Sequence, residues 1–146
     1  MTKKLNVLVV GANGMVGSSV ANKLSSSKKV QNLITSTRED TDLFSSEQTK
    51  KLIEENKPDV LIIAAAKVGG ILYNNTNRTE FILENLKINI NLLESCLNFP
   101  NIKIINLGSS CIYPLEADNP ISENEFMNGK LEPTNSPYAM AKLTAI

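Results

Sequence analysis

The sequence predicts an α/β fold built on a Rossmann-like, doubly wound parallel sheet. Three short and nearly continuous apolar runs, at Leu5–Val10, Val60–Ala66 and Ile102–Leu107, are typical of strands buried on both faces. Helical patterns separate the strands, so strand and helix alternate along the chain. A length of 146 residues suits one domain with a sizeable core. We therefore expect residues 1–146 to form a single α/β domain.

The elements between these strands follow from local patterns. Ser45 and Gln48 have the spacing of a capping box that opens a helix ending near Glu55. The chain between residues 67 and 77 is rich in Gly and Asn and predicts a loop, and residues 108–137 predict a long irregular segment. The other expected elements are a helix at Val16–Ser25, a strand at Val30–Ser36, a helix at Thr79–Leu97 and a helix opened by Tyr138.

The expected helix at Thr79–Leu97 has an apolar stripe. Its members recur every three or four residues, which predicts one buried face. They are Ile82, Leu86, Ile90, Leu93 and Leu97.

Composition narrows the function classes. The formal net charge is zero, which gives no indication of a nucleic-acid or membrane surface. The apolar runs are shorter than a membrane span, and Gly11 and Asn13 interrupt the first run where a signal peptide would continue, so we expect a cytoplasmic protein. Two cysteines and no histidine predict neither a metal site nor a disulfide framework, and Cys96 fits a buried apolar position.

A glycine-rich turn, Gly11-Ala12-Asn13-Gly14-Met15-Val16-Gly17, follows the first strand and opens the first helix. In that context Gly11 allows a tight turn, Gly14 lets a pyrophosphate approach the backbone, and Gly17 lets the helix pack on the strand. Free N–H groups and the helix dipole favour an anion there. The turn therefore predicts a dinucleotide site, with an ordinary glycine turn as the alternative.

The end of the second strand bears on the choice of dinucleotide. NAD sites usually place an acid there, whereas this chain has Arg38, whose guanidinium suits a 2′-phosphate. The neighbours Glu39 and Asp40 leave NAD as an alternative, and Arg38 as a solvated loop residue is a further one. The pattern favours NADP.

Tyr138 and Lys142 lie four residues apart, which places them on one helix face. A free phenol titrates near pH 10, and a neighbouring ammonium favours the phenolate, so we expect Lys142 to lower the pKa of Tyr138. Ser109 follows the fourth strand, at the edge where parallel sheets bind ligands, and can hydrogen-bond a carbonyl oxygen. These three residues predict hydride transfer from a nicotinamide with tyrosine as the proton donor.

Several stretches together resemble the GDP-L-fucose synthase family, whose members are GDP-4-keto-6-deoxymannose 3,5-epimerase/4-reductases of the extended short-chain dehydrogenases. The matching stretches are GANGMVGS at Gly11–Ser18, AAKVGGI at Ala65–Ile71, NNT at Asn74–Thr76, LGSSCIYP at Leu107–Pro114 and LEPTNSPYAMAK at Leu131–Lys142. They cover nearly the whole chain, and the KVGG and SSCIYP runs are more specific than the glycine turn.

The resemblance implies a role for each site residue. Ser109 would polarise the ketone, Tyr138 would donate the proton, and Lys142 would tune Tyr138 and bind the nicotinamide ribose. Cys111 would move protons at the sugar carbons beside the ketone, the alternative being a packed loop thiol. NADPH would be the cofactor and GDP-4-keto-6-deoxymannose the substrate. The predicted cofactor-binding residues are Gly11, Asn13, Gly14, Met15, Val16, Gly17, Arg38, Asp42, Leu43, Ala65, Leu107, Gly108 and Lys142.

The chain also departs from the family pattern. The family carries a basic pair where this chain has Ala12-Asn13, and a histidine downstream of the lysine that pairs with the cysteine. We expect a C-terminally truncated domain without a substrate domain, inactive or weakly active unless a complementing C-terminal half supplies the rest. The expected protein partner is a second copy of the chain in a homodimer, or that complementing half. Another nucleotide-sugar epimerase or dehydratase, or an inactive fragment that binds NADP or a partner, are the alternatives.

Overall fold

A computed structural model describes residues 3–146; Met1 and Thr2, which the sequence analysis placed before the first strand, lie outside the described residues. The chain forms two compact units. The first unit holds the residues up to Ala66 together with Lys87–Leu107, and the second holds Lys67–Leu86 together with Gly108–Ile146.

The first unit contains a four-stranded sheet in which every strand is parallel to its neighbours, in the order β2-β1-β3-β4. The strands are β1 (Leu5–Val10), β2 (Val30–Ser36), β3 (Val60–Ile63) and β4 (Lys103–Asn106). The last residues of all four strands are paired in register, so the strands end at one edge of the sheet. The predicted α/β fold is confirmed.

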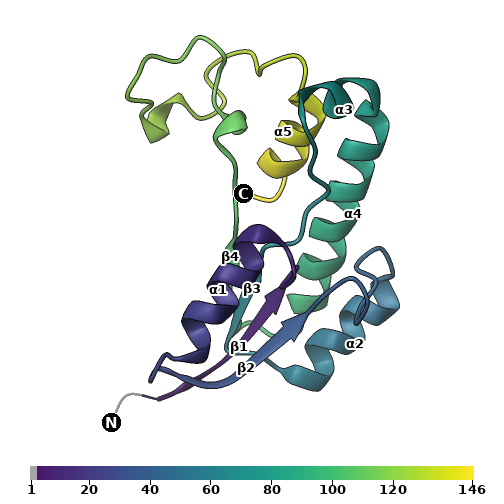
Figure 1. The fold of residues 1–146 in the computed structure, drawn as a ribbon, viewed down its shortest axis with the longest axis vertical. Coiled ribbons are helices and arrows are strands. Elements are labelled where there is room, and N and C mark those ends of the chain that lie inside the picture. Colours follow the sequence, from purple (N-terminus) through teal and green to yellow (C-terminus); the bar gives the residue numbers. More distant parts are fainter. Residues whose placement is uncertain (1–2) are drawn as a thin grey trace. The chain divides into compact units, whose positions relative to one another are not determined.

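Helices cover both faces of this sheet (Figure 1). On one face Val7, Val9 and Ile62 pack with Val20 and Leu24 of α1 (Met15–Ser25). On the other face, the side chains of α2 (Ser46–Asn56) and the C-terminal half of α4 (Arg78–Cys96) complete the main core. That core consists of Leu8, Val10, Ile53, Leu61, Ile63, Ile88, Leu92 and Cys96, so the buried position predicted for Cys96 is confirmed.

The second unit contains α3 (Ile71–Thr76), the N-terminal half of α4, α5 (Ser136–Leu143) and two short 3₁₀ turns at Ser110–Ile112 and Glu123–Glu125. The expectation of a loop between residues 67 and 77 was wrong at α3. The side chain of Asn74 donates to the carbonyl oxygens of Gly69 and Gly70, at 2.7 and 3.1 Å, and so holds the preceding backbone against the helix. These side-chain to backbone hydrogen bonds offset the weak helical propensity of an Asn-rich segment.

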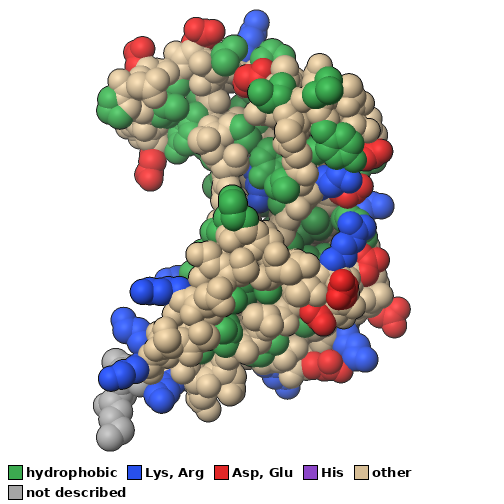
Figure 2. All heavy atoms as spheres, viewed as in Figure 1, with side chains coloured by type: hydrophobic (Ala, Val, Ile, Leu, Met, Phe, Trp, Pro, Cys, Tyr) green, Lys and Arg blue, Asp and Glu red, His purple; other side chains and the backbone are tan. Residues whose placement is uncertain are grey.

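The predicted buried face of α4 was also wrong. Ile90 is 49% exposed and Leu97 is 77% exposed, whereas Phe81, Ile88 and Leu92 are buried. The true buried face includes polar residues, among them Asn85, Asn89 and Ser95, so a pattern of apolar residues alone selected a neighbouring stripe. On the face shown in Figure 2, basic side chains gather at the lower left, whereas basic and acidic side chains are mixed at the lower right.

Candidate functional site

The glycine turn of the first unit joins β1 to α1 and packs tightly. Gly11 has a φ of 76°, a conformation that favours glycine, and its N–H donates to the carbonyl oxygen of Ser36 at the end of β2. A Cβ on Gly11 would lie 2.6 Å from the backbone nitrogen of Ala65, and one on Gly17 would lie 2.1 Å from the carbonyl oxygen of Gly11. Neither position accepts a side chain, so the turn keeps its backbone bare.

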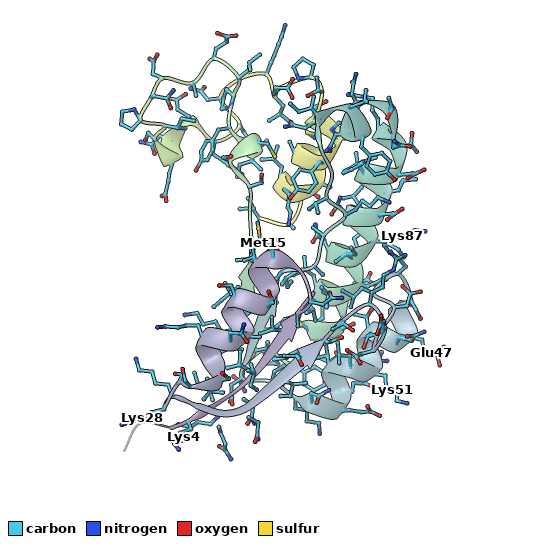
Figure 3. The ribbon with its side chains drawn as sticks, in the orientation of Figure 1. Lys4, Met15, Lys28, Glu47, Lys51 and Lys87 are labelled. Carbon is cyan, nitrogen blue, oxygen red and sulfur yellow. The ribbon has the colours of Figure 1, made fainter. Side chains whose placement is uncertain are left out.

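The N-terminus of α1 presents the features of an anion site. Gly14 is the N-cap residue, no side chain caps the helix, and the first turn carries no acidic residue. The N–H groups of a first helical turn lack acceptors within the helix, and together with the helix dipole they attract an anion such as a pyrophosphate. Met15 and Val16 stand exposed beside the turn, Met15 at 88% (Figure 3). An exposed apolar side chain at this place suits contact with a bound organic ligand.

The segment after β2 leaves a guanidinium exposed. Arg38 is exposed and its guanidinium carbon lies 5.6 Å from the centroid of the Phe44 ring. The neighbouring Asp40 accepts hydrogen bonds from the backbone N–H and the hydroxyl of Thr37, both at 2.8 Å, and these bonds lower the pKa of its carboxyl group. Asp40, one of the two acidic residues that left NAD as an alternative, is therefore hydrogen-bonded within its own turn.

The other predicted cofactor residues of this unit differ in their surroundings. Ala65 follows β3 and touches the glycine turn, and Leu107 follows β4, where its N–H donates to the carbonyl oxygen of Ile63. Both lie at the edge of the sheet where the strands end. Asp42, by contrast, accepts the N–H of Phe44, and the side chain of Leu43 packs against the main core, so each has a structural contact of its own.

The second unit brings the four predicted catalytic residues together. Ser109 precedes the 3₁₀ turn at Ser110–Ile112, and its hydroxyl oxygen accepts a hydrogen bond from the thiol of Cys111 at 3.0 Å. Ser109 also hydrogen-bonds the phenol of Tyr138. On α5, the ammonium of Lys142 lies 5.8 Å from the centroid of the Tyr138 ring, and Lys142 is only 4% exposed. We call Ser109, Cys111, Tyr138 and Lys142 the catalytic cluster.

Burial dominates the electrostatics of the catalytic cluster. It raises the pKa of Tyr138; the negative charge of the Cys111 thiolate adds to the rise, and the hydrogen bond with Ser109 opposes it. Burial also lowers the pKa of Lys142, and Cys111 opposes that change. We expected Lys142 to lower the pKa of Tyr138, but in this structure that pKa is raised, and Lys142 is not among the causes. Burial and the charge of Cys111 disfavour the phenolate more than the hydrogen bond with Ser109 favours it.

The start of α5 is held by two residues that the sequence analysis missed. The carboxylate of Glu132 accepts the N–H of Thr134, the hydroxyl of Thr134 and the N–H of Asn135, at 2.6 to 3.1 Å. These bonds lower the pKa of Glu132. Arg78, at the start of α4, donates to the carbonyl oxygen of Pro133 at 2.6 Å and to the hydroxyl of Ser136 at 2.9 Å. The turn before Tyr138 is therefore fixed from within and from α4.

The KVGG segment is held by α4 as well. The side chain of Asn85 accepts the N–H of Lys67 at 2.9 Å and donates to the carbonyl oxygen of Lys67 at 3.1 Å. The ammonium of Lys67 lies 3.4 Å from Glu84 and 3.7 Å from Glu80. The sequence analysis considered only the apolar residues of this helix. It therefore gave no indication that Asn85 is buried and holds the KVGG segment.

Within the described residues 3–146, no cluster of three or more histidine, cysteine or acidic side chains could hold a metal ion. Over the same residues, every helix is too short or too polar to cross a bilayer.

A parallel sheet with a bare glycine turn after its first strand defines a protein of the Rossmann type.

Comparison with known proteins gives the family. Residues 7–146 match the NAD dependent epimerase/dehydratase family, and the chain belongs to it. It is 40% identical to GDP-L-fucose synthase of Escherichia coli K12 over 98% of this chain and 44% of that protein. It is 37% identical to GDP-L-colitose synthase of Yersinia pseudotuberculosis over 97% of this chain and 45% of that protein.

A solved structure agrees with these relatives. The GDP-L-fucose synthetase of Naegleria fowleri bound to NADP superposes with a TM-score of 0.86 and 29% identity, over 99% of this chain and 46% of that one. The chain spans less than half the length of each of these proteins. The resemblance that the motifs indicated, to GDP-L-fucose synthases, is confirmed.

Proposed function

We propose that this chain supplies the cofactor-binding and proton-transfer residues of an NADP-dependent enzyme that epimerises and reduces GDP-4-keto-6-deoxymannose to GDP-L-fucose. The observation that carries the proposal is the catalytic cluster. A hydroxyl, a thiol, a phenol and an ammonium gather in one unit, from segments about thirty residues apart. Similarity to the Escherichia coli GDP-L-fucose synthase supports the choice of substrate.

The residues of the cluster suit the reduction of a ketone. The bound NADPH supplies the hydride. Tyr138 donates a proton to the carbonyl oxygen, and Ser109 donates a hydrogen bond to the same oxygen. A donor must hold its proton at working pH, and the raised pKa of Tyr138 keeps the phenol protonated. Lys142 places a positive charge beside the ring, where it stabilises the phenolate that forms on transfer.

Epimerisation requires a group that removes a proton from a carbon beside the ketone. Such protons become acidic once the carbonyl oxygen is stabilised, and Ser109 and Tyr138 supply hydrogen bonds for that purpose. The thiol of Cys111 lies 3.0 Å from Ser109 and is partly exposed, so it suits the role. The chain described here has no histidine, so the second acid/base group must be of another type or come from other residues.

NADP is the dinucleotide favoured by the first unit. The bare turn and the uncapped N-terminus of α1 suit a pyrophosphate, and the exposed guanidinium of Arg38 suits a 2′-phosphate. The NADP-bound structure from Naegleria fowleri supports the same choice. A cytoplasmic location, and a homodimer or a complementing C-terminal half as partner, complete the proposal.

A second candidate is another GDP-sugar epimerase or reductase of the same family. The 37% identity to a GDP-L-colitose synthase favours it almost as strongly as the fucose relatives favour the first. The catalytic cluster does not choose between the two, because its residues act on a ketone and on protons beside it and not on the rest of the sugar. The product formed from GDP-4-keto-6-deoxymannose separates the two candidates.

Titration of the purified chain with NADPH, followed by the fluorescence of the reduced nicotinamide, tests the cofactor. We expect Arg38→Ala to weaken NADPH binding by about 10- to 100-fold and to leave NADH binding unchanged, because a charge-assisted hydrogen bond is lost. The matched control is Lys28→Ala, since Lys28 is an exposed cation just beyond the far end of α1 (Figure 3). Equal loss with NADPH and NADH, or no binding to the unaltered chain, would contradict the proposal.

Oxidation of NADPH in the presence of GDP-4-keto-6-deoxymannose tests the chemistry. Tyr138→Phe removes the proton donor and keeps the ring, so we expect the rate to fall by about 10²- to 10⁴-fold while NADPH affinity is unchanged. Cys111→Ser should slow the exchange of carbon-bound substrate protons with deuterated water more than it slows the reduction of the ketone. A Tyr138→Phe chain as fast as the unaltered one would refute the assignment.

A further inference from the structure

Arg78 contacts the start of α5 and has no part in the proposed chemistry. Its two terminal nitrogens donate to two different acceptors, the carbonyl oxygen of Pro133 and the hydroxyl of Ser136. Those acceptors stand 55 and 58 residues further along the chain. We propose that Arg78 is a positioning residue, which sets Tyr138 in the catalytic cluster by fixing the first turn of α5. This inference rests on the proposed function of Tyr138.

The start of α5 needs such support. Its N-cap residue Asn135 makes no side-chain capping bond, and Pro137 in the first turn has no N–H. The first backbone bond of the helix runs from the N–H of Ala139 to the carbonyl oxygen of Asn135. With only 8 residues, α5 is too short to be stable alone. Its placement therefore depends on contacts made by the turn that precedes it.

Arg78 is suited to the task by its shape as well as its charge. A guanidinium is a planar fork that can satisfy two acceptors at once, whereas a lysine ammonium is a point charge that favours no such pair. Ser136 relays the contact, because its hydroxyl donates to Pro133, at 3.1 Å, and accepts from Arg78. The three residues form a closed set of hydrogen bonds two residues before Tyr138.

Glu132 completes the connection from the other side. Its carboxylate holds Thr134 and Asn135, and the positive charge of Arg78 is among the causes that lower its pKa. A cation from α4 and an anion within the turn thus act on adjoining residues of that turn. Loss of Arg78 would remove the hydrogen bonds to Pro133 and Ser136. It would also make the ionised form of Glu132 less stable, because the nearby positive charge is gone.

The consequence for Tyr138 is electrostatic. The phenol owes its raised pKa first to burial and then to the nearby Cys111 thiolate. If the first turn of α5 moves outward, both causes weaken and the pKa of Tyr138 falls toward the ordinary value for tyrosine. Arg78 makes neither contact itself, so a change in the titration of Tyr138 reports position rather than a lost direct interaction.

The test uses the 146-residue chain with Tyr73→Phe and Tyr113→Phe, which leaves Tyr138 as the only tyrosine. Its phenolate is followed by ultraviolet absorbance as pH rises, without cofactor. We expect Arg78→Ala to lower the pKa of Tyr138, and Arg78→Lys to lower it less. Lys87→Ala, which removes an exposed cation from the same helix α4, is the matched control and should leave the titration unchanged.

Amide hydrogen exchange gives a second reading in the same protein. We expect Arg78→Ala to speed exchange at Ala139 by about tenfold, equivalent to about 1.4 kcal/mol of local opening free energy. Exchange at Thr49 in α2, whose N–H donates to Ser45, should not change. Adding Ser136→Ala to Arg78→Ala should produce little further effect, because the hydrogen bond between Arg78 and Ser136 is already absent in Arg78→Ala.

Unchanged titration of Tyr138 in Arg78→Ala would overturn the inference. Equal acceleration at Ala139 and Thr49 with no shift of Tyr138 would also overturn it, since Arg78 would then serve only general stability. If Arg78→Ala does not fold, Arg78→Lys and Ser136→Ala carry the same test, and an unshifted Tyr138 in both refutes the role. None of these readings needs NADPH, so a failure of dinucleotide binding would refute the proposed function and leave this result intact.

Discussion

Gly17→Ala tests the packing of the glycine turn, because the added methyl group has two opposing effects on stability: it favours the helix and it clashes with the turn. Gly17 is the buried residue of the first turn of α1. A Cβ there would lie 2.1 Å from the carbonyl oxygen of Gly11 and 2.9 Å from its carbonyl carbon. Close carbon–oxygen contacts in proteins are about 3.3 Å or longer, so the helix and the turn would have to separate by about 1 Å.

The sign of the effect follows from comparing the two contributions. Replacing glycine by alanine inside a helix normally stabilises it by about 1 kcal/mol. Overpacking a tight contact costs about 1–3 kcal/mol, and the cost lies at the upper end here because a backbone carbonyl cannot rotate away. We therefore expect a net loss of about 1–2 kcal/mol in the free energy of unfolding of the first unit. NADPH binding should fall as well, because the turn is displaced.

Urea unfolding followed by circular dichroism measures the stability, and NADPH titration measures the site. Ser19→Ala is the control, because Ser19 is an exposed residue of the same helix and its replacement should stabilise by about 0.5 kcal/mol. If Gly17→Ala were as stabilising as Ser19→Ala, the close approach of helix and turn would be refuted, and with it the reason for a bare backbone at the turn.

Three further outcomes follow from the described contacts. Leu92→Ala empties a fully buried position and should cost about 2–5 kcal/mol of unfolding free energy in urea, whereas Leu97→Ala, at a residue that is 77% exposed, should change it by less than about 0.5 kcal/mol. Ser45→Ala removes the cap of α2 and should cost about 1 kcal/mol by the same measurement. The pKa of Asp59 is lowered first by its bond with Lys3, so its contribution to stability is present above the ordinary value of 3.8 and is lost as pH falls through the lowered pKa. Asp59→Asn should therefore be less stable than the unaltered chain at pH 7, and the two urea midpoints should converge as pH falls through the lowered pKa of Asp59.

Much of the fold could be predicted from the sequence, because buried parallel strands leave a strong signal. The ranges of β1 and β2 are those expected, and the cap at Ser45 forms as predicted, although Gln48 bonds Asp42 rather than closing a full capping box. The third and fourth strands are shorter than their apolar runs. Ala64 still donates its N–H to Val10 of β1, and beyond it Ala65 packs against the glycine turn, a contact that no local pattern contains.

The site was predicted less evenly. Tyr138, Lys142, Ser109 and Cys111 came from spacing and resemblance, and the structure brings them together in one unit. The contacts that position them come from residues distant in sequence. Arg78 lies 58 residues before Ser136, and a surface arginine in a polar stretch carries no signal of that contact. The direction of the pKa shift at Tyr138 was missed for a related reason, since burial depends on the packing of the whole unit.

The charge of Cys111 connects the two halves of the proposed reaction. When Cys111 is ionised, its negative charge raises the pKa of Tyr138 and so favours the protonated phenol. In the proposed reaction, Cys111 loses that charge when it takes a proton from the sugar carbon. The pKa of Tyr138 would then fall, and the phenol would donate its proton to the carbonyl oxygen more readily. The same cluster would then favour epimerisation before reduction.

This coupling can be measured without substrate in the chain whose only tyrosine is Tyr138. Cys111→Ala and Cys111→Ser both remove the thiolate, and Cys111→Ser keeps a side chain of similar size that can still donate to Ser109. We expect both to lower the pKa of Tyr138, because one cause of its elevation is gone while burial persists. A drop in Cys111→Ala alone would assign the effect to packing, and no drop in either would show that the order of the two steps is set elsewhere.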